Sequence, residues 1–181
     1  MSPMKKLPLG LAVASCALAS VASAQESSSI GVRLRAGYYL GSSFRLRSGN
    51  TGSLNGLELA VDFPFSRWHR WELAFTPAIV LGGALGKGGD TDGQVYRFSL
   101  SLRSWISSAM YAHIQAGFAH TEARNSSFKD VNDFTTGVAL GFPIGNAPKF
   151  ASKYRPTFEA GAYLSPHRQL NGLVFSLGFS F

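Results

Sequence analysis

Hydrophobic residues recur at every second position through most of this chain, and the final segment shows the pattern most plainly. Residues 173–181 carry leucine or phenylalanine at each odd position: Leu173, Phe175, Leu177, Phe179 and Phe181. The positions between them hold small or polar residues, apart from Val174. Because successive side chains of a β-strand point to opposite faces, this segment is predicted to be a strand with one large apolar face.

Seven earlier segments repeat this alternation, and turn residues separate them. They cover residues 30–40, 56–63, 71–81, 96–103, 110–118, 134–142 and 154–164. An even number of antiparallel strands of about ten residues is typical of a small transmembrane barrel. The pattern therefore predicts an all-β fold, an eight-stranded antiparallel up-and-down transmembrane β-barrel.

Two places depart from simple alternation. Pro77 lies in the middle of the 71–81 strand, and because proline lacks a backbone N–H, a bulge or break is predicted there. Residues 64–70 are predicted to form a turn. Trp68 and Trp71 beside this turn are typical of an aromatic belt at a membrane interface.

Alternation alone does not decide which face of the barrel meets the solvent, because a soluble lipocalin-like barrel alternates with the phases reversed. The exterior of a soluble barrel would be dense in Lys, Glu, Thr and Asp. Here the second face is mostly Gly, Ala, Ser and Thr with scattered charges. We therefore expect the apolar face to meet lipid and the small residues to line a narrow lumen, with a soluble periplasmic ligand-binding barrel as the alternative.

Charged side chains on the second face are predicted to meet inside the lumen. They are Arg33, Arg35, Glu58, Asp62, Glu72, Arg97, Arg103, Arg155 and Glu159, with His113 and Gln115 close to them. Adjacent antiparallel strands would bring together Arg35 with Glu58, Arg33 with Asp62, and Glu72 with Arg103. Buried charges must be paired, so we expect this network to plug the lumen. The alternative is a gated proton or ion path.

Long connections are predicted mainly at one end of the barrel. If both termini are periplasmic, the connections 41–53, 82–94, 120–131 and 165–169 face outward, and the first three are long, as extracellular loops usually are. The 143–153 connection would be an unusually long periplasmic turn.

The first 24 residues read as a secretory signal. Lys5 and Lys6 precede an apolar run, and residues 22–24 form a small-x-small cleavage site before Gln25. The predicted domains are a signal peptide, 1–24, and an outer-membrane barrel, 25–181. The alternative is lipidation at Cys16, the chain's one cysteine, whose flanking residues fit a lipobox loosely.

Charge and hydropathy narrow the class further. The formal net charge is +7; without Lys5 and Lys6, 15 basic residues face 10 acidic ones, which gives +5. These basic residues are dispersed, so no nucleic-acid partner is predicted. No later run of about 20 apolar residues could form a transmembrane helix, so a membrane protein of this sequence must be a closed barrel.

The sequence contains four histidines that could take part in catalysis, His69, His113, His120 and His167. Lipid hydrolysis of the serine type needs a histidine that activates a serine and a carboxylate that orients it. Only His120 lies near candidate partners, Glu122, Ser126 and Ser127. A lipid A-modifying enzyme is therefore the alternative to a non-enzymatic barrel.

Metal and cofactor motifs are incomplete. Residues 90–93, Asp-Thr-Asp-Gly, resemble the start of a calcium loop but lack the third acidic position and the terminal Glu. No zinc-ligand spacing or phosphate-binding loop occurs in the sequence. We predict no metal and no cofactor.

The terminal strand that ends on Phe181 resembles the C-terminal sorting strand of bacterial outer-membrane barrels. The mature chain as a whole is similar to the small eight-stranded barrels of the OmpA transmembrane-domain and OmpX group. This resemblance rests on pattern and implies that the barrel assembly machinery recognises Leu173, Phe175, Leu177, Phe179 and Phe181.

The same resemblance implies a location and a role. The protein would be secreted to the periplasm and inserted into the bacterial outer membrane, where its partners are lipid and lipopolysaccharide. Its role would be non-enzymatic, either envelope integrity or contact with an extracellular partner through the three long loops.

Overall fold

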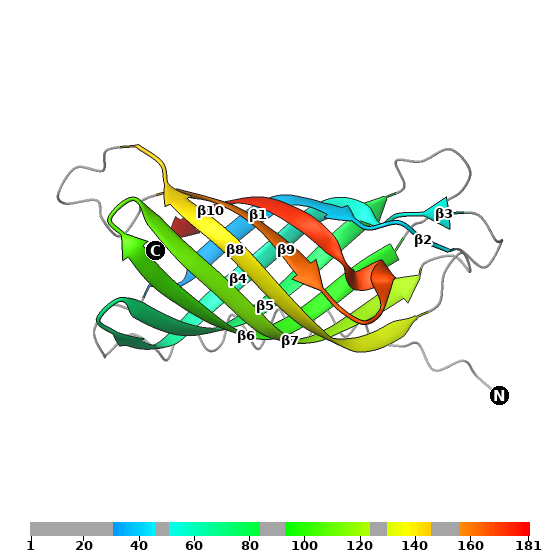
Figure 1. Ribbon diagram of the computed structural model, residues 1–181, viewed down its shortest axis with the longest axis horizontal. Coiled ribbons are helices and arrows are strands. Elements are labelled where there is room, and N and C mark those ends of the chain that lie inside the picture. The colour runs from blue at the N-terminus through cyan, green and yellow to red at the C-terminus, as the bar shows by residue number, and fades with distance from the viewer. Residues whose placement is uncertain (1–30, 46–50, 84–92, 124–129, 146–155) are drawn as a thin grey trace, which may run out of the picture. The chain divides into compact units, whose positions relative to one another are not determined.

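The computed structural model of the protein describes residues 31–45, 51–83, 93–123, 130–145 and 156–181. Within them, eight long antiparallel strands close into a barrel (Figure 1), in the order β1-β10-β9-β8-β7-β6-β5-β4. Their bounds are β1 Arg33–Gly41, β4 Asn55–Trp68, β5 Trp71–Gly83, β6 Gly93–Ser107, β7 Met110–Ala123, β8 Val131–Pro143, β9 Thr157–Leu164 and β10 Gly172–Ser180. The predicted fold class is confirmed.

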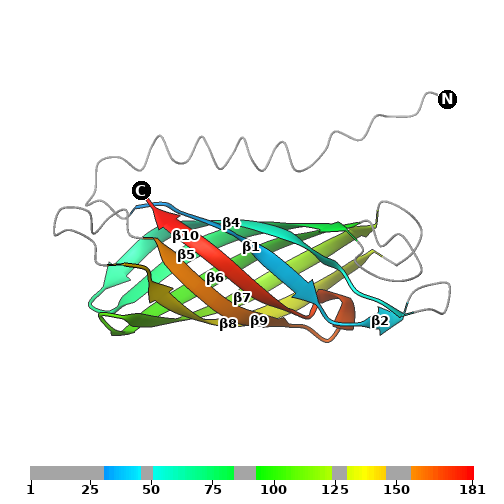
Figure 2. The same ribbon diagram turned by 90° about the horizontal axis from the view of Figure 1, so that it is seen from above.

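The last strand closes the barrel on the first. Figure 2 shows β10 beside β1, and the register runs from Arg33 opposite Ser180 to Gly41 opposite Gly172. The backbone N–H of Phe181 extends this ladder by donating to the carbonyl of Val32 at 2.9 Å. Neither strand is left with an open edge, which would otherwise expose unpaired backbone groups.

Described connections lie at both ends of the barrel. At the turn end, residues 69–70 join β4 to β5 and residues 108–109 join β6 to β7, whereas the predicted 143–153 connection lies mostly outside the described residues. At the loop end lie the connections after β1 and β9. The first contains a short hairpin of β2 (Phe44–Arg45) and β3 (Thr51–Gly52), which the sequence did not indicate, and the last contains the 3-10 turn η2 (Arg168–Leu170).

Two predicted strand ends were wrong because the strands are longer than their apolar segments. The predicted 64–70 turn is mostly strand: β4 continues to Trp68, and only residues 69–70 turn, with His69 at a φ of 49°. The predicted 120–131 loop begins too early, because β7 continues to Ala123. Backbone ladder bonds do not require a strict alternation of apolar side chains, so both strands continue through residues that break it.

The predicted bulge or break at Pro77 is confirmed only as an interruption of the pairing with β4. Pro77 pairs with Phe98 of β6 in an unbroken register. On the other side, pairing of β5 with β4 is interrupted near Pro77 but resumes in the same register. The register shift of β4 lies instead between Pro64 and Ser66. A missing proline donor is therefore accommodated without a bulge.

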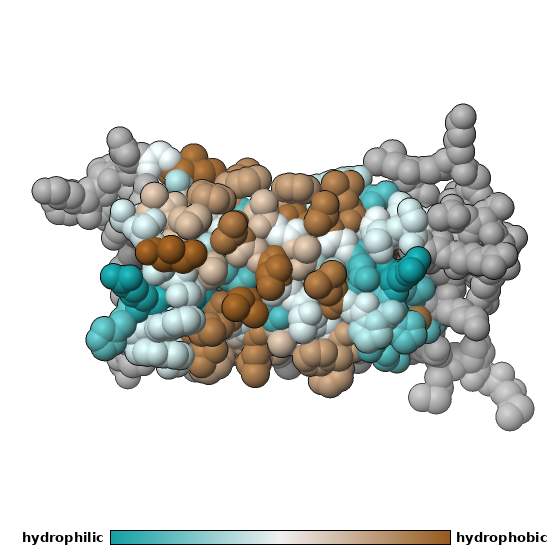
Figure 3. All heavy atoms as spheres, viewed as in Figure 1, coloured by the Kyte–Doolittle hydropathy of each residue, from teal (hydrophilic) through white to brown (hydrophobic). Residues whose placement is uncertain are grey.

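The apolar faces of the strands point outward. Every odd residue from Leu173 to Phe181 is exposed, as are large apolar side chains on the other strands, such as Leu100, Ile114 and Val138. Figure 3 shows hydrophobic residues gathered in the middle of the visible face of the barrel, with hydrophilic residues toward both ends. This phase is opposite to that of a soluble barrel, so the alternative of a soluble periplasmic barrel is wrong.

Within the described ranges, no helix is long and apolar enough to span a bilayer.

Candidate functional site

The lumen contains a charged network whose first member, near the turn end, is Glu72. Its Oε1 lies 2.5 Å from Arg103 Nη1 and 3.5 Å from Arg33 Nη1. Its Oε2 lies 3.1 Å from Nη2 of Arg67, whose side chain is half exposed. Glu72 therefore connects the buried charges to the solvated rim.

Asp62 is the next carboxylate inward and is fully buried. Its oxygens lie 2.9 Å from Arg103 Nη2, 3.2 Å from Arg35 Nη2 and 3.8 Å from Arg33 Nη1. The hydroxyl of Thr76 also donates to it at 3.0 Å. A buried carboxylate requires such partners, because an unpaired charge costs several kcal/mol.

Glu159 receives contacts from side chains on several strands. Arg35 Nη1 lies at 3.1 Å and Arg103 Nη2 at 3.4 Å. Tyr111 donates its hydroxyl at 2.6 Å, and His113 Nδ1 lies at 3.1 Å. These ion pairs and hydrogen bonds connect β1, β6, β7 and β9 through one carboxylate.

Glu58 and Arg97 form a separate pair toward the loop end, with Oε2 and Nη1 2.8 Å apart. The Arg97 guanidinium lies over two aromatic rings, 3.9 Å from the Tyr163 centroid and 4.7 Å from that of Tyr39. Tyr163 also donates its hydroxyl to Glu58 at 3.3 Å. Ion pairing and cation–π contact together hold this pair in place.

All eight residues of the predicted lumen network are buried, four arginines and four carboxylates: Arg33, Arg35, Arg97, Arg103, Glu58, Asp62, Glu72 and Glu159. Their partners differ in one case from the expected pairs. The register sets Gly37 opposite Glu58, and the ion pairs of Arg35 go to Asp62 and Glu159. Arg155 lies outside the described residues.

Three inward tyrosines belong to the site, although the sequence analysis gave them no role there. Each ring lies over a glycine of the neighbouring strand: Tyr111 over Gly141, Tyr163 over Gly137, and Tyr39 over Gly172. A Cβ at any of these glycines would collide with the ring. This packing could have been predicted from the sequence, because each inward tyrosine lies beside an inward glycine on the adjacent strand.

An apolar cluster lies in the loop-end part of the lumen beside the Glu58–Arg97 pair, and the register sets Val80 opposite Glu58. It contains Val80, Val95 and Val174 from the strands, and Leu54 and Leu170 from connections at the loop end. Leu54 and Leu170 are almost completely buried, with 1% and 0% of their surface exposed. We refer to these five residues as the apolar cap.

Asp133 fastens the β9–β10 connection that carries Leu170. Its Oδ2 accepts the Ser165 hydroxyl at 2.7 Å and the backbone N–H of His167 at 3.2 Å, and lies 2.7 Å from His167 Nδ1. Asp133 lies at the loop end of β8, in contact with this connection and beyond the apolar band. Hydrogen bonds from His167 and Ser165 lower the pKa of Asp133 to about 2.

The catalytic candidate His120 faces outward near the loop end of β7. Its Nδ1 lies 2.7 Å from Asn132 Oδ1, and its ring stacks on Tyr96 with centroids 6.3 Å apart. The expected partners Ser126 and Ser127 lie outside the described residues. The contacts of His120 are therefore with an amide and a phenol.

Two of the remaining histidines, His113 and His167, have other partners. His113 contacts Glu159 inside the lumen. His167 and Ser165 both contact Asp133, so the Ser165 hydroxyl donates to the carboxylate and not to an imidazole. Across the described ranges, no group of three His, Cys, Asp or Glu side chains is arranged to hold a metal ion.

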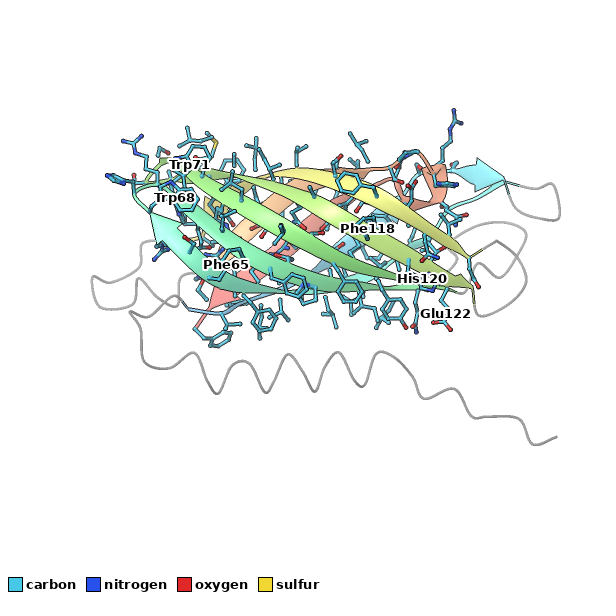
Figure 4. The ribbon with its side chains drawn as sticks, turned by 90° about the horizontal axis from the view of Figure 1, so that it is seen from below. Phe65, Trp68, Trp71, Phe118, His120 and Glu122 are labelled. Carbon is cyan, nitrogen blue, oxygen red and sulfur yellow. The ribbon has the colours of Figure 1, made fainter. Side chains whose placement is uncertain are left out.

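The residues of the predicted assembly signal all face outward on or just after β10. Leu173, Phe175, Leu177, Phe179 and Phe181 are between 41% and 58% exposed. Figure 4 places Phe65, Trp68 and Trp71 at one end of the barrel and His120 and Glu122 toward the other. The exposed tryptophans thus lie at the turn end, where an aromatic belt was predicted.

Comparison with known proteins gives structural matches only. No protein-family model matches the sequence, and no curated protein does. The crystal structure of the outer-membrane protein Ail of Yersinia pestis aligns with a TM-score of 0.54 and 16% identity, covering 83% of this chain and 97% of Ail. Neisserial surface protein A aligns with a TM-score of 0.55 and 14% identity, covering 82% and 94%. The chain therefore has the fold of the small eight-stranded outer-membrane barrels, and with its apolar exterior this places it in a bacterial outer membrane.

Proposed function

We propose that the protein is a sealed, non-enzymatic outer-membrane barrel of the OmpA transmembrane-domain and OmpX kind, which supports the envelope and contacts partners at its loop end. The observation that carries this proposal is the filled lumen. Four arginines pair with four carboxylates there, and the apolar cap lies beside the Glu58–Arg97 pair.

A filled lumen favours a structural role over transport. The interior of an eight-stranded barrel is just wide enough for side chains to fill. An ion entering from the loop end would meet the buried Leu54 and Leu170 and the Glu58–Arg97 ion pair. Breaking a buried pair costs about 3–5 kcal/mol, so we expect the resting barrel not to conduct.

Two measurements on the same preparation test this proposal. Folded protein from the outer-membrane fraction should migrate differently in SDS before and after boiling, because a closed barrel resists SDS until it is heated. In planar bilayers the same sample should give no steady conductance, with a larger porin as the positive control. Steady conductance of the folded form would favour the gated ion path.

The enzymatic alternative has its own test. Lipid A from cells that express the protein should have the same mass spectrum as lipid A from cells that express His120→Ala or no protein. If lipid A loses an acyl chain in cells with the wild-type protein but not in cells with His120→Ala, lipid A modification would be the function in place of the structural role.

The outward face implies lipid as a direct partner. We propose that lipopolysaccharide contacts the barrel at its loop end, phospholipid contacts it at its turn end, and the barrel assembly machinery inserts it through the terminal strand. The long connections at the loop end are the proposed contacts for an extracellular partner.

A further inference from the structure

Two rows of outward side chains cross β6, β7 and β8 near the loop end. Tyr96, His120 and Asn132 are direct neighbours across the three strands. Two residues closer to the barrel's middle lies a second row: Phe98, Phe118 and Phe134. In Figure 4, His120 and Glu122 lie beyond Phe118 on the same strand. The outward surface therefore changes from apolar to polar between these two rows.

This change falls within the strands β6, β7 and β8. On the other five strands the exposed outward residue nearest the loop end is a leucine, between 39% and 57% exposed: Leu40, Leu57, Leu81, Leu164 and Leu173. Polar residues such as His167 and Arg168 follow in the connections. We call the polar outward residues at the loop end of β6–β8 the outer patch: Gln94, Tyr96, His120, Glu122 and Asn132.

The outer patch offers two flat rings and several polar groups. The His120 ring stacks on Tyr96 at an interplanar angle of 19°, and its Nδ1 is fixed by Asn132. Tyr96 donates its hydroxyl to Gln94, which lies opposite Glu122. Amide, imidazole, phenol and carboxylate groups supply both donors and acceptors, which suits a ligand rich in hydroxyl groups.

The phenylalanine row indicates that the ligand also has an apolar part. Phe118 is 67% exposed and Phe134 47%, and their rings meet edge to face with centroids 5.7 Å apart. This row is continuous with the lipid-facing surface of the barrel. A ligand that covers both rows needs a polar head and acyl chains that descend from it.

We propose that the outer patch binds the sugar headgroup of an outer-leaflet glycolipid, whose acyl chains pack on Phe98, Phe118 and Phe134. This inference rests on the proposed function, because it requires the loop end to lie at the outer leaflet. Aromatic side chains with a polar edge are enriched at this depth of a membrane protein.

The test uses the full chain folded in phosphatidylcholine nanodiscs and rough lipopolysaccharide, which lacks O-antigen, as the probe. Native mass spectrometry counts the glycolipid molecules that bind per barrel. His120→Ala and Asn132→Ala are each expected to raise the apparent Kd about fivefold, the effect of one lost hydrogen bond. Thr136→Ala, which removes an outward polar group of β8 inside the apolar band, is the matched control and should leave the Kd unchanged.

Two further probes separate headgroup binding from other contacts. Phosphatidylglycerol should bind the wild type and both patch variants equally, and free core oligosaccharide should bind far more weakly than the glycolipid. Equal glycolipid binding by all variants, or equal binding of the free oligosaccharide, would overturn the inference. A heat-induced mobility shift for each variant shows that the barrel is folded, so loss of that shift in the wild type would count against the proposed function instead.

Discussion

Glu159 lies on β9 and contacts side chains of three other strands, β1, β6 and β7. It therefore connects strands that are not neighbours in the barrel. Glu159→Gln keeps its shape but removes the charge that balances Arg35 and Arg103. Leaving buried guanidinium groups without a counter-charge is expected to lower the free energy of unfolding by about 3–5 kcal/mol. Urea unfolding of the barrel in lipid vesicles measures this loss.

Arg67→Ala is the control for that substitution. Arg67 also contacts a lumen carboxylate, Glu72 Oε2 at 3.1 Å, but its side chain is 50% exposed. Solvent screens such a pair, so a loss below about 1 kcal/mol is expected. Equal losses for the two variants would mean that the charge of Glu159 adds nothing beyond a rim contact.

At this scale the sequence predicts which side chains point inward but not which of them meet. Alternation correctly places Arg35 inside. Its contact with Glu159 crosses between strands that are not neighbours in the barrel, since β10 lies between β1 and β9. A long flexible side chain can reach several carboxylates across a narrow lumen. Residue spacing along the chain therefore does not predict which carboxylate it pairs with.

The β9–β10 connection depends on one residue of another strand. Asp133→Asn removes the charge that holds His167 and weakens the acceptor for Ser165. The connection should loosen, and trypsin should cleave after the exposed Arg168 faster than in wild type. Glu122→Gln, an exposed carboxylate elsewhere at the loop end, is the control; unchanged cleavage in Asp133→Asn would contradict a fastening role.

The contacts of Asp133 with the β9–β10 connection should depend on pH only under acidic conditions. Because the folded-state pKa of Asp133 is lowered below its ordinary value of 3.8, its carboxylate stabilises the fastened form above about pH 4 and loses this effect as pH falls toward 2. NMR titration of the Asp133 carboxyl carbon should give a midpoint near 2. A midpoint near 4 would show that these hydrogen bonds are not maintained in solution.

The terminal strand has two separable roles, closure and the proposed assembly signal. Deleting Phe181 removes one ladder hydrogen bond, to Val32, and an outward ring. The purified variant should still refold in detergent, whereas the heat-modifiable form should be depleted in the outer membrane of cells. Normal assembly in cells would reject the signal, and failure to refold would make closure the dominant role.

Element types and facing follow from the sequence, but element ends do not. The alternation in residues 71–81 and 173–181 corresponds to β5 and β10. The strand ends and the extent of the disruption at Pro77 were misjudged for one reason: the ladder is made by the backbone and by the strands on either side. Those neighbours keep Pro77 in register and extend β7 past His120, and a single segment carries no information about them.

The whole molecule has a predicted orientation, with its turn end in the periplasm. Cys16, the only cysteine, lies in the predicted signal, so a Cys16→Ser chain offers a clean background for single cysteines. On intact cells a membrane-impermeant maleimide should label Arg168→Cys but not Ser108→Cys. Labelling of Ser108→Cys without permeabilising the cells would reverse the orientation and with it the glycolipid proposal.

The seam between β1 and β10 means that the covalent order of the strands is separate from their order in the barrel. Gly31 lies beside Phe181, so a short linker could join the two ends and the chain could be cut instead between Ser108 and Ala109. Such a circular permutant would keep every ladder and every lumen contact described above. It would no longer end on an aromatic residue, so it separates what the finished barrel needs from what the cell needs to build it.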